Sequence, residues 1–215
     1  MTLLLWALSA WADSPLTTVE LHQAYADDPL VQRALERGTL DAKLTRALLK
    51  GDDDLGTKAA IVSALGWSMD GRDETTALLD AAARRHRKPA ARLLAEPELL
   101  DPAEAFVLGY RLALDGYFDP QAAIPLLERA RAGLPRSRTV ALVTAITQAQ
   151  LLMDHDWCGV WRVTEAALAD PILERDLAEQ AEAEAIAYLS LYQPACEPGI
   201  EEETPLATPP LEPQD

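Results

Sequence analysis

The stretch AFVLGYRLALDGYFDPQAAIPLLERARAGLP (residues 105–135) is followed by a second stretch of the same pattern, ALVTAITQAQLLMDHDWCGVWRVTEAALADP (residues 141–171). Framework residues of the two match at a constant offset of 36 positions, pairing Ala105 with Ala141, Gly109 with Ala145, Ala123 with Gly159, Leu127 with Val163, Ala130 with Ala166 and Pro135 with Pro171. Small residues let two helices approach closely, and proline marks the boundary to the next helix. Because a single hairpin cannot bury its apolar face, the sequence predicts helical hairpins that stack.

The rest of the chain has the composition of an all-α protein. Ala and Leu dominate, β-branched and aromatic residues are sparse, and the ten glycines are scattered singly, which favours helices over strands. Asp28 and Pro29 form a helix start, with the acid as cap and proline at the first helical position. We expect short connections and antiparallel neighbouring helices, over residues 17–26, 29–38, 39–51, 52–71, 73–87, 89–96, 101–115, 119–132, 137–153, 156–169 and 171–192.

Residues 101–192 resemble the tetratricopeptide repeat, whose helix-turn-helix unit carries a Leu-Gly pair, small residues and a closing proline. FVLGYRL supplies Leu108 and Gly109, although the period is longer than usual and the later copy lacks the Leu-Gly pair. Upstream, AIVSALGWSMDGRDETTALLDAAARR (60–85) is similar to both HEAT and tetratricopeptide hairpins. The resemblance implies an α-solenoid of antiparallel helical hairpins, with HEAT- or tetratricopeptide-like hairpins over 13–100 and tetratricopeptide-like repeats over 101–196. Such proteins hold peptides or partner proteins on an extended surface.

An aromatic stripe is the first candidate binding surface. Phe106, Tyr110 and Tyr117 lie beside the packing stripe of the helix expected over 101–115. On a solenoid this flank faces the concave surface, where family members bind peptides. The alternative is that the preceding helix covers the stripe, since an apolar stripe usually belongs to the core.

The formal net charge of −16 repels phosphate backbones and anionic lipid headgroups, so nucleic acid is not an expected partner. The basic exception is ARRHRK (83–88), which carries Arg84, Arg85, Arg87 and Lys88 at the end of an expected helix. These cations either complement the negative end of the helix dipole or form a docking patch for an acidic partner.

The first residues, MTLLLWALSAWADSP, resemble a secretory signal peptide cleaved after Ala12, because an apolar run is followed by small residues. We therefore expect residues 1–12 to be removed and the protein to be periplasmic or secreted. The alternatives are a buried first helix and a cytoplasmic protein. Elsewhere no apolar run is long enough to span a membrane. Residues 197–215 carry five prolines and six acids, the composition of a disordered acidic tail.

The two cysteines of the chain, Cys158 and Cys196, are expected to form a disulfide in an oxidising compartment. Pro194 must turn the chain back for Cys196 to reach Cys158, which begins a helix. The alternatives are a zinc site with His155 and an acid, for which the usual paired ligand spacing is missing, and a reactive thiol.

Motifs of catalysis and of cofactor binding are absent from the sequence, which has no HExxH, GxSxG, P-loop or dinucleotide glycine pattern. We therefore expect no catalytic residues, no cofactor and no metal. The expected function is that of a protein-protein interaction module or scaffold. The alternative is a hydrolase or other enzyme on a helical scaffold, whose acidic catalytic residues the sequence does not identify.

Overall fold

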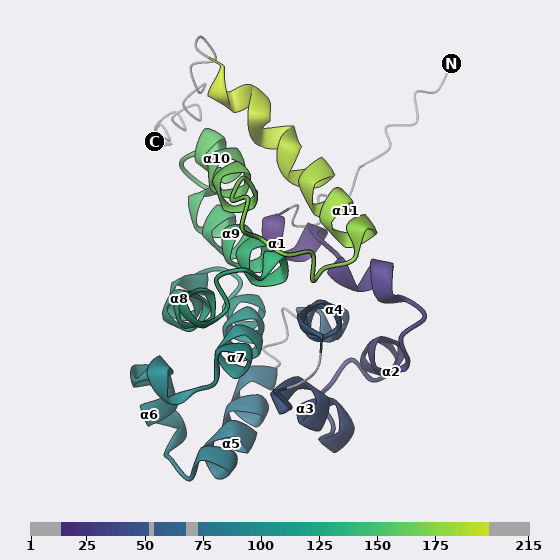
Figure 1. The fold of residues 1–215 in the computed structure, drawn as a ribbon, viewed down its shortest axis with the longest axis vertical. Coiled ribbons are helices and arrows are strands. Elements are labelled where there is room, and N and C mark those ends of the chain that lie inside the picture. Colours follow the sequence, from purple (N-terminus) through teal and green to yellow (C-terminus); the bar gives the residue numbers. More distant parts are fainter. Residues whose placement is uncertain (1–13, 52–53, 68–72, 198–215) are drawn as a thin grey trace, which may run out of the picture.

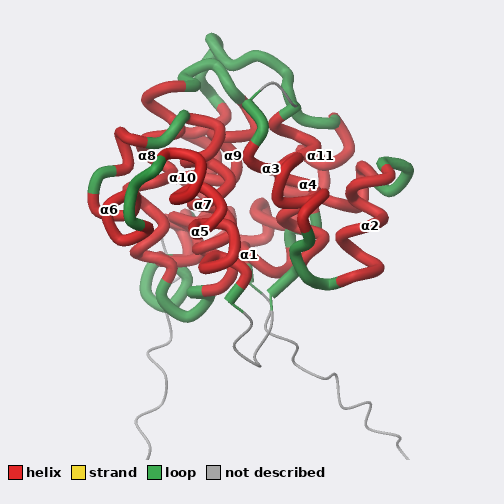
Figure 2. The backbone as a smooth tube through the Cα atoms, turned by 90° about the horizontal axis from the view of Figure 1, so that it is seen from below, coloured by secondary structure: helices red, strands yellow, loops and turns green. Residues whose placement is uncertain are grey.

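The computed structural model describes residues 14–51, 54–67 and 73–197. Over these ranges the chain is all-α, as the composition predicts, with no β-strand (Figures 1 and 2). The α-helices are α1 (Pro15–Thr18), α2 (Pro29–Arg37), α3 (Ala42–Leu49), α4 (Leu55–Leu65), α5 (Glu74–His86), α6 (Ala90–Ala95), α7 (Pro102–Asp115), α8 (Ile124–Gly133), α9 (Arg138–Leu152), α10 (Trp157–Leu168) and α11 (Glu179–Leu189). The described ranges also contain the 3₁₀ helices η1 (Leu21–Tyr25), η2 (Pro97–Leu99), η3 (Pro120–Ala123) and, after α11, η4 (Ser190–Cys196).

Helix starts follow the capping residues of the sequence. The Asp28 carboxylate accepts hydrogen bonds from the amides of Leu30 (2.7 Å) and Val31 (3.2 Å), and Pro29 is the first residue of α2. That helix ends at Gly38, whose φ of 61° is in the left-handed region that glycine adopts without strain. The predicted start and stop of this helix are confirmed.

The two matching stretches of sequence form two matching pairs of helices. The bounds of α7 recur in α9, and those of η3 with α8 recur in α10, each within one residue of an offset of 36. In the first pair, a Cβ atom added to Gly109 would lie 2.9 Å from Cγ of Leu127 and 3.1 Å from Cβ of Leu126. Gly109 therefore allows α7 to approach α8 closely, which is the role its small size predicts.

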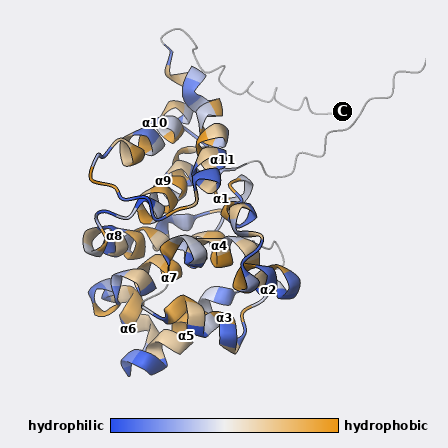
Figure 3. Ribbon diagram, turned by 45° about the vertical axis from the view of Figure 1, so that its right-hand side comes forward, coloured by the Kyte–Doolittle hydropathy of each residue, from blue (hydrophilic) through white to orange (hydrophobic). Residues whose placement is uncertain are grey.

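Helix α4 lies at the centre of the molecule and contacts α2, α7 and α9 (Figure 1). Its apolar residues Ala59, Ala60, Ile61 and Val62 are all at most 1% exposed, and its ribbon is largely apolar on the hydropathy scale (Figure 3). A helix that is apolar all round is stable only when neighbours surround it. The N-terminal part of the chain is consequently packed onto the two helix pairs.

The predictions for residues 17–26 and 171–192 are wrong in part. The first segment forms only the short helices α1 and η1, and α11 begins at Glu179. Residues before α11 bind the start of α9 instead: the Asp176 carboxylate accepts hydrogen bonds from the Ser137 hydroxyl (2.5 Å) and the Thr139 amide (2.9 Å). The Glu174 amide donates to the Arg136 carbonyl (2.7 Å), so the connection is held extended rather than helical.

The described helices include none with the length and apolar character needed to cross a bilayer.

Replacing Gly109 with Val is expected to lower the free energy of unfolding by about 2 kcal/mol, the usual cost of overpacking a closely packed site. Thermal unfolding followed by circular dichroism should show a melting temperature lower by roughly 5 °C. Gly51→Val is the matched control, because a Cβ at Gly51 meets no atom within 4 Å. Equal stability of the two variants would contradict the close approach of α7 and α8.

Candidate functional site

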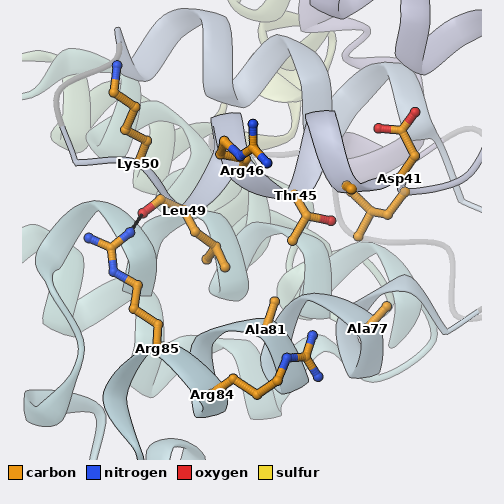
Figure 4. Close-up of a pocket in the computed structure, with 11 residues that line it drawn as sticks. Asp41, Thr45, Arg46, Leu49, Lys50, Ala77, Ala81, Arg84 and Arg85 are labelled. Atoms are coloured by element: carbon orange, nitrogen blue, oxygen red, sulfur yellow. Dashed lines mark hydrogen bonds between the residues drawn. The ribbon is translucent and has the colours of Figure 1, made fainter.

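A groove runs between α3 and α5 (Figure 4). The two helices are parallel: the amide of Leu40, before α3, donates to Oε2 of Glu74 at the start of α5 (2.8 Å). At the other end, the guanidinium of Arg85 donates to the carbonyl of Leu49. The groove encloses about 610 Å³ and is lined by Leu40, Asp41, Ala42, Thr45, Arg46, Leu49, Lys50, Ala77, Ala81, Arg84 and Arg85.

Small side chains keep the groove open. Ala77 and Ala81 lie one turn apart on α5, and Ala42 and Thr45 come from α3. These four small side chains form the floor of the groove, between the larger side chains of the two helices. Leu44, Leu48 and Leu78 point the other way, since they are completely buried, whereas Leu49 at the end of α3 lines the groove. Each helix is thus fixed by its apolar face, and its small-residue face is left uncovered.

Four cations line the groove, Arg46 and Lys50 from α3 and Arg84 and Arg85 from α5. Arg46 and Arg84 are exposed, and neither forms an ion pair with any residue that the structure describes. Arg46, Arg84 and Arg85 belong to the last turns of their helices and Lys50 is the C-cap residue of α3, positions where cations complement the helix dipole. Even so, an exposed guanidinium retains five N–H donors suited to carboxylates.

Arg85 differs from Arg46 and Arg84 because its side chain holds helices of the fold together. Its Nε lies 3.3 Å from Oε1 of Glu104, and His86 Nε2 lies 2.6 Å from Oε2 of the same carboxylate. Glu104 is 1% exposed and also accepts from the Asp101 amide (3.2 Å) at the start of α7. The end of α5 is therefore attached to α7 through one buried carboxylate.

Asp41 lies at the opposite end of the groove and is the N-cap of α3. The hydrogen bond from Arg33 and, after it, those from the Leu44 and Lys43 amides lower the pKa of its carboxyl from 3.8 to about 2. Arg37 lies 3.2 Å from the same carboxylate. The acid at this end is thus neutralised by arginines of α2.

The predicted basic patch is divided by the structure. Arg84 and Arg85 line the groove, whereas Arg87 and Lys88 are exposed residues beyond α5 that line none of it. Arg87 has a φ of 54° and ends the helix, its amide donating to the Ala83 carbonyl. The sequence interpretation missed Arg46 and Lys50, although their spacing of four residues in TLDAKLTRALLKG places both on one face of a helix.

The aromatic stripe is not an accessible binding surface. Phe106, Tyr110 and Tyr117 are 0%, 2% and 8% exposed, so their proposed role on a concave face is wrong. Tyr117 stacks on Trp67 (ring centroids 4.6 Å apart) after the end of α4. Burial raises the pKa of Tyr110 to about 12, and its hydroxyl hydrogen-bonds with Ser63 of α4. Part of the cover of these aromatic side chains therefore comes from α4 and from Trp67, two residues after its end. The sequence did not place this segment beside α7.

Cys158 and Cys196 are brought together as the sequence predicts. Their sulfur atoms are 2.10 Å apart, at disulfide distance, and Pro194 lies in the 3₁₀ helix that returns the chain to α10. His155 is exposed in the turn before α10. Among the described residues, no group of three or more His, Cys, Asp or Glu side chains is arranged to hold a metal ion.

Comparison of the chain with protein-family models, curated proteins and solved structures found no match. The expected signal peptide (1–12) and all but the first residue of the expected tail (197–215) lie outside the described residues.

Acid should remove the stabilisation that Asp41 contributes. Because the folded-state pKa of Asp41 is depressed to about 2, this contribution is present above its ordinary pKa of 3.8 and is lost as the pH falls from about 4 to 2. Urea unfolding measured over this range should show a smaller loss of stability for Asp41→Asn than for the unchanged protein. Asp28→Asn, which alters the cap of α2, is the control, and identical pH profiles for the Asp41 variant and the unchanged protein would refute the assignment.

Proposed function

We propose that this protein is an interaction module that binds an acidic segment of a partner protein in the groove between α3 and α5. The observation that carries the proposal is the pair of unpaired guanidinium groups, Arg46 and Arg84, over a floor of small side chains. On a chain of net charge −16, such a cationic groove attracts acidic ligands locally while the rest of the surface repels them. Apolar contact with the floor supplies affinity, and the arginines supply selectivity.

We also propose that α7 to α10 form a short α-solenoid. The recurrence of helix bounds at an offset near 36 residues supports this arrangement, as does the contact of α8 with α9, which joins the two pairs. In this view the solenoid is the support, and the binding groove lies on the N-terminal helices packed against it. This assignment replaces the concave aromatic stripe as the binding surface.

Reversing the charge of the two free arginines tests the binding function. A fluorescent amphipathic peptide of about 14 residues, roughly four helical turns, with glutamates at one end and an Ala/Leu stripe is the probe. The Arg46→Glu/Arg84→Glu double variant should bind it at least about tenfold more weakly in fluorescence anisotropy, since two attractive charge contacts become repulsive.

The control for that experiment is the Arg162→Glu/Arg175→Glu double variant, which makes the same change of net charge at two exposed positions away from the groove. It should retain the affinity of the unchanged protein at physiological salt, where distant charges are screened. Equal weakening by both double variants would assign the effect to net charge and would reject the groove as the site.

We also propose that the protein is exported from the cytoplasm to an oxidising compartment. The disulfide distance between Cys158 and Cys196 supports it, because disulfides persist in oxidising compartments and are rare in the cytosol. The intact mass of the protein purified from its native host should be smaller than that of the full reduced chain by the mass of residues 1–12 and of two hydrogen atoms. Retention of Met1 together with two thiols that react with iodoacetamide would contradict export and the disulfide.

A further inference from the structure

The groove between α3 and α5 constrains the backbone of its ligand. An extended peptide gains affinity by pairing with an exposed strand edge, but the backbone groups along both walls are engaged within helices. A helical ligand satisfies its own backbone hydrogen bonds and presents only side chains. The floor, with Ala77 and Ala81 one turn apart, suits the apolar stripe of such a helix, which also recurs every three or four residues.

Charge along the groove is unequal, and this sets the direction of the ligand. Arg46, Lys50, Arg84 and Arg85 gather where α3 and α5 end (Figure 4). At the other end, Asp41 is already paired with Arg33 and Arg37 of α2 and leaves no free cation for a ligand's acids among the residues that line the groove. The ligand's acids must therefore lie at the C-terminal ends of α3 and α5. Acidic residues are best tolerated in the first turn of a helix, where they complement its positive dipole end.

We infer that the groove receives an amphipathic helix with an acidic first turn, lying antiparallel to α3 and α5. In this orientation the ligand's first turn contacts Arg46 and Arg84, and its apolar stripe follows Ala81 and Ala77 toward Asp41. The positive end of the ligand's dipole also lies beside the negative ends of α3 and α5, whereas a parallel helix would bring like dipole ends together. The inference rests on the proposed function, because it names the ligand of the same groove.

Two peptides of equal composition test the direction in which the ligand helix lies in the groove. They share one Ala/Leu stripe and differ only in whether their glutamates occupy the first or the last turn. The first-turn peptide should bind about tenfold more tightly in fluorescence anisotropy, and its circular dichroism should gain helix on binding. The Arg46→Gln/Arg84→Gln variant, which removes these two charges without reversing them, should show a smaller difference in affinity between the two peptides, with Lys50 and Arg85 still at the same end of the groove.

The position of the ligand is measured independently of affinity. A nitroxide at the amino end of the first-turn peptide should broaden the amide NMR signals of residues 84–86 more than those of residues 74–77. Equal affinity of both peptides, stronger broadening at 74–77, or binding without a gain of helix would overturn the inference, while the proposed binding of acidic segments in the groove would stand. Failure of both peptides to bind would instead reject the proposed function.

Discussion

The burial of α4 is the constraint on which the rest of the structure depends. Its apolar surface is covered by α2, α7, α9 and the 3₁₀ helix η1. Polar contacts hold residues near both of its ends. The buried ammonium of Lys58 donates to the Lys50 carbonyl at the end of α3, and Arg111 of α7 donates to the Gly66 carbonyl (2.7 Å). Because α3 precedes α4 and α5 follows it, these contacts also place the two helices that form the groove.

The groove and its supports use arginine in two different ways. Arg85 and Arg111 are scaffold residues: Arg85 joins α5 to the Leu49 carbonyl and to the Glu104 carboxylate of α7, and Arg111 joins α7 to the Gly66 carbonyl after α4. The guanidinium of Arg111 is also paired with Asp115 of its own helix. Arg46 and Arg84 contact no such partner among the described residues. A buried or bridging guanidinium costs stability when its partner is lost, whereas an exposed one is replaceable at little cost. Arg46 and Arg84 are thus the guanidinium groups of the groove that remain available to a ligand, which is the role proposed for them.

Local features of the sequence predicted local structure well. The caps at Asp28 and Gly38, the repeat of helix bounds near 36 residues and the approach of Cys158 to Cys196 all follow from short-range patterns. Contacts between distant segments were not predictable in this way. An apolar stripe such as that of Phe106 has the same periodicity whether a ligand or α4 covers it. Likewise, α11 begins late because Asp176 binds the start of α9, a contact with no local sequence signal.

Charge, in addition to side-chain size, distinguishes the groove between α3 and α5 from the close contact of α7 with α8. Gly109 lets α7 approach α8 until Leu126 and Leu127 fill the space, with no charge between them. Between α3 and α5, small residues also permit close approach, but Arg46 and Arg84 come from opposite walls. Closing the groove would bring these cations together and strip water from them, which is unfavourable without counter-charges. In the proposed complex an acidic ligand supplies those counter-charges, so contact that is unfavourable between the two helices alone becomes favourable with such a ligand between them.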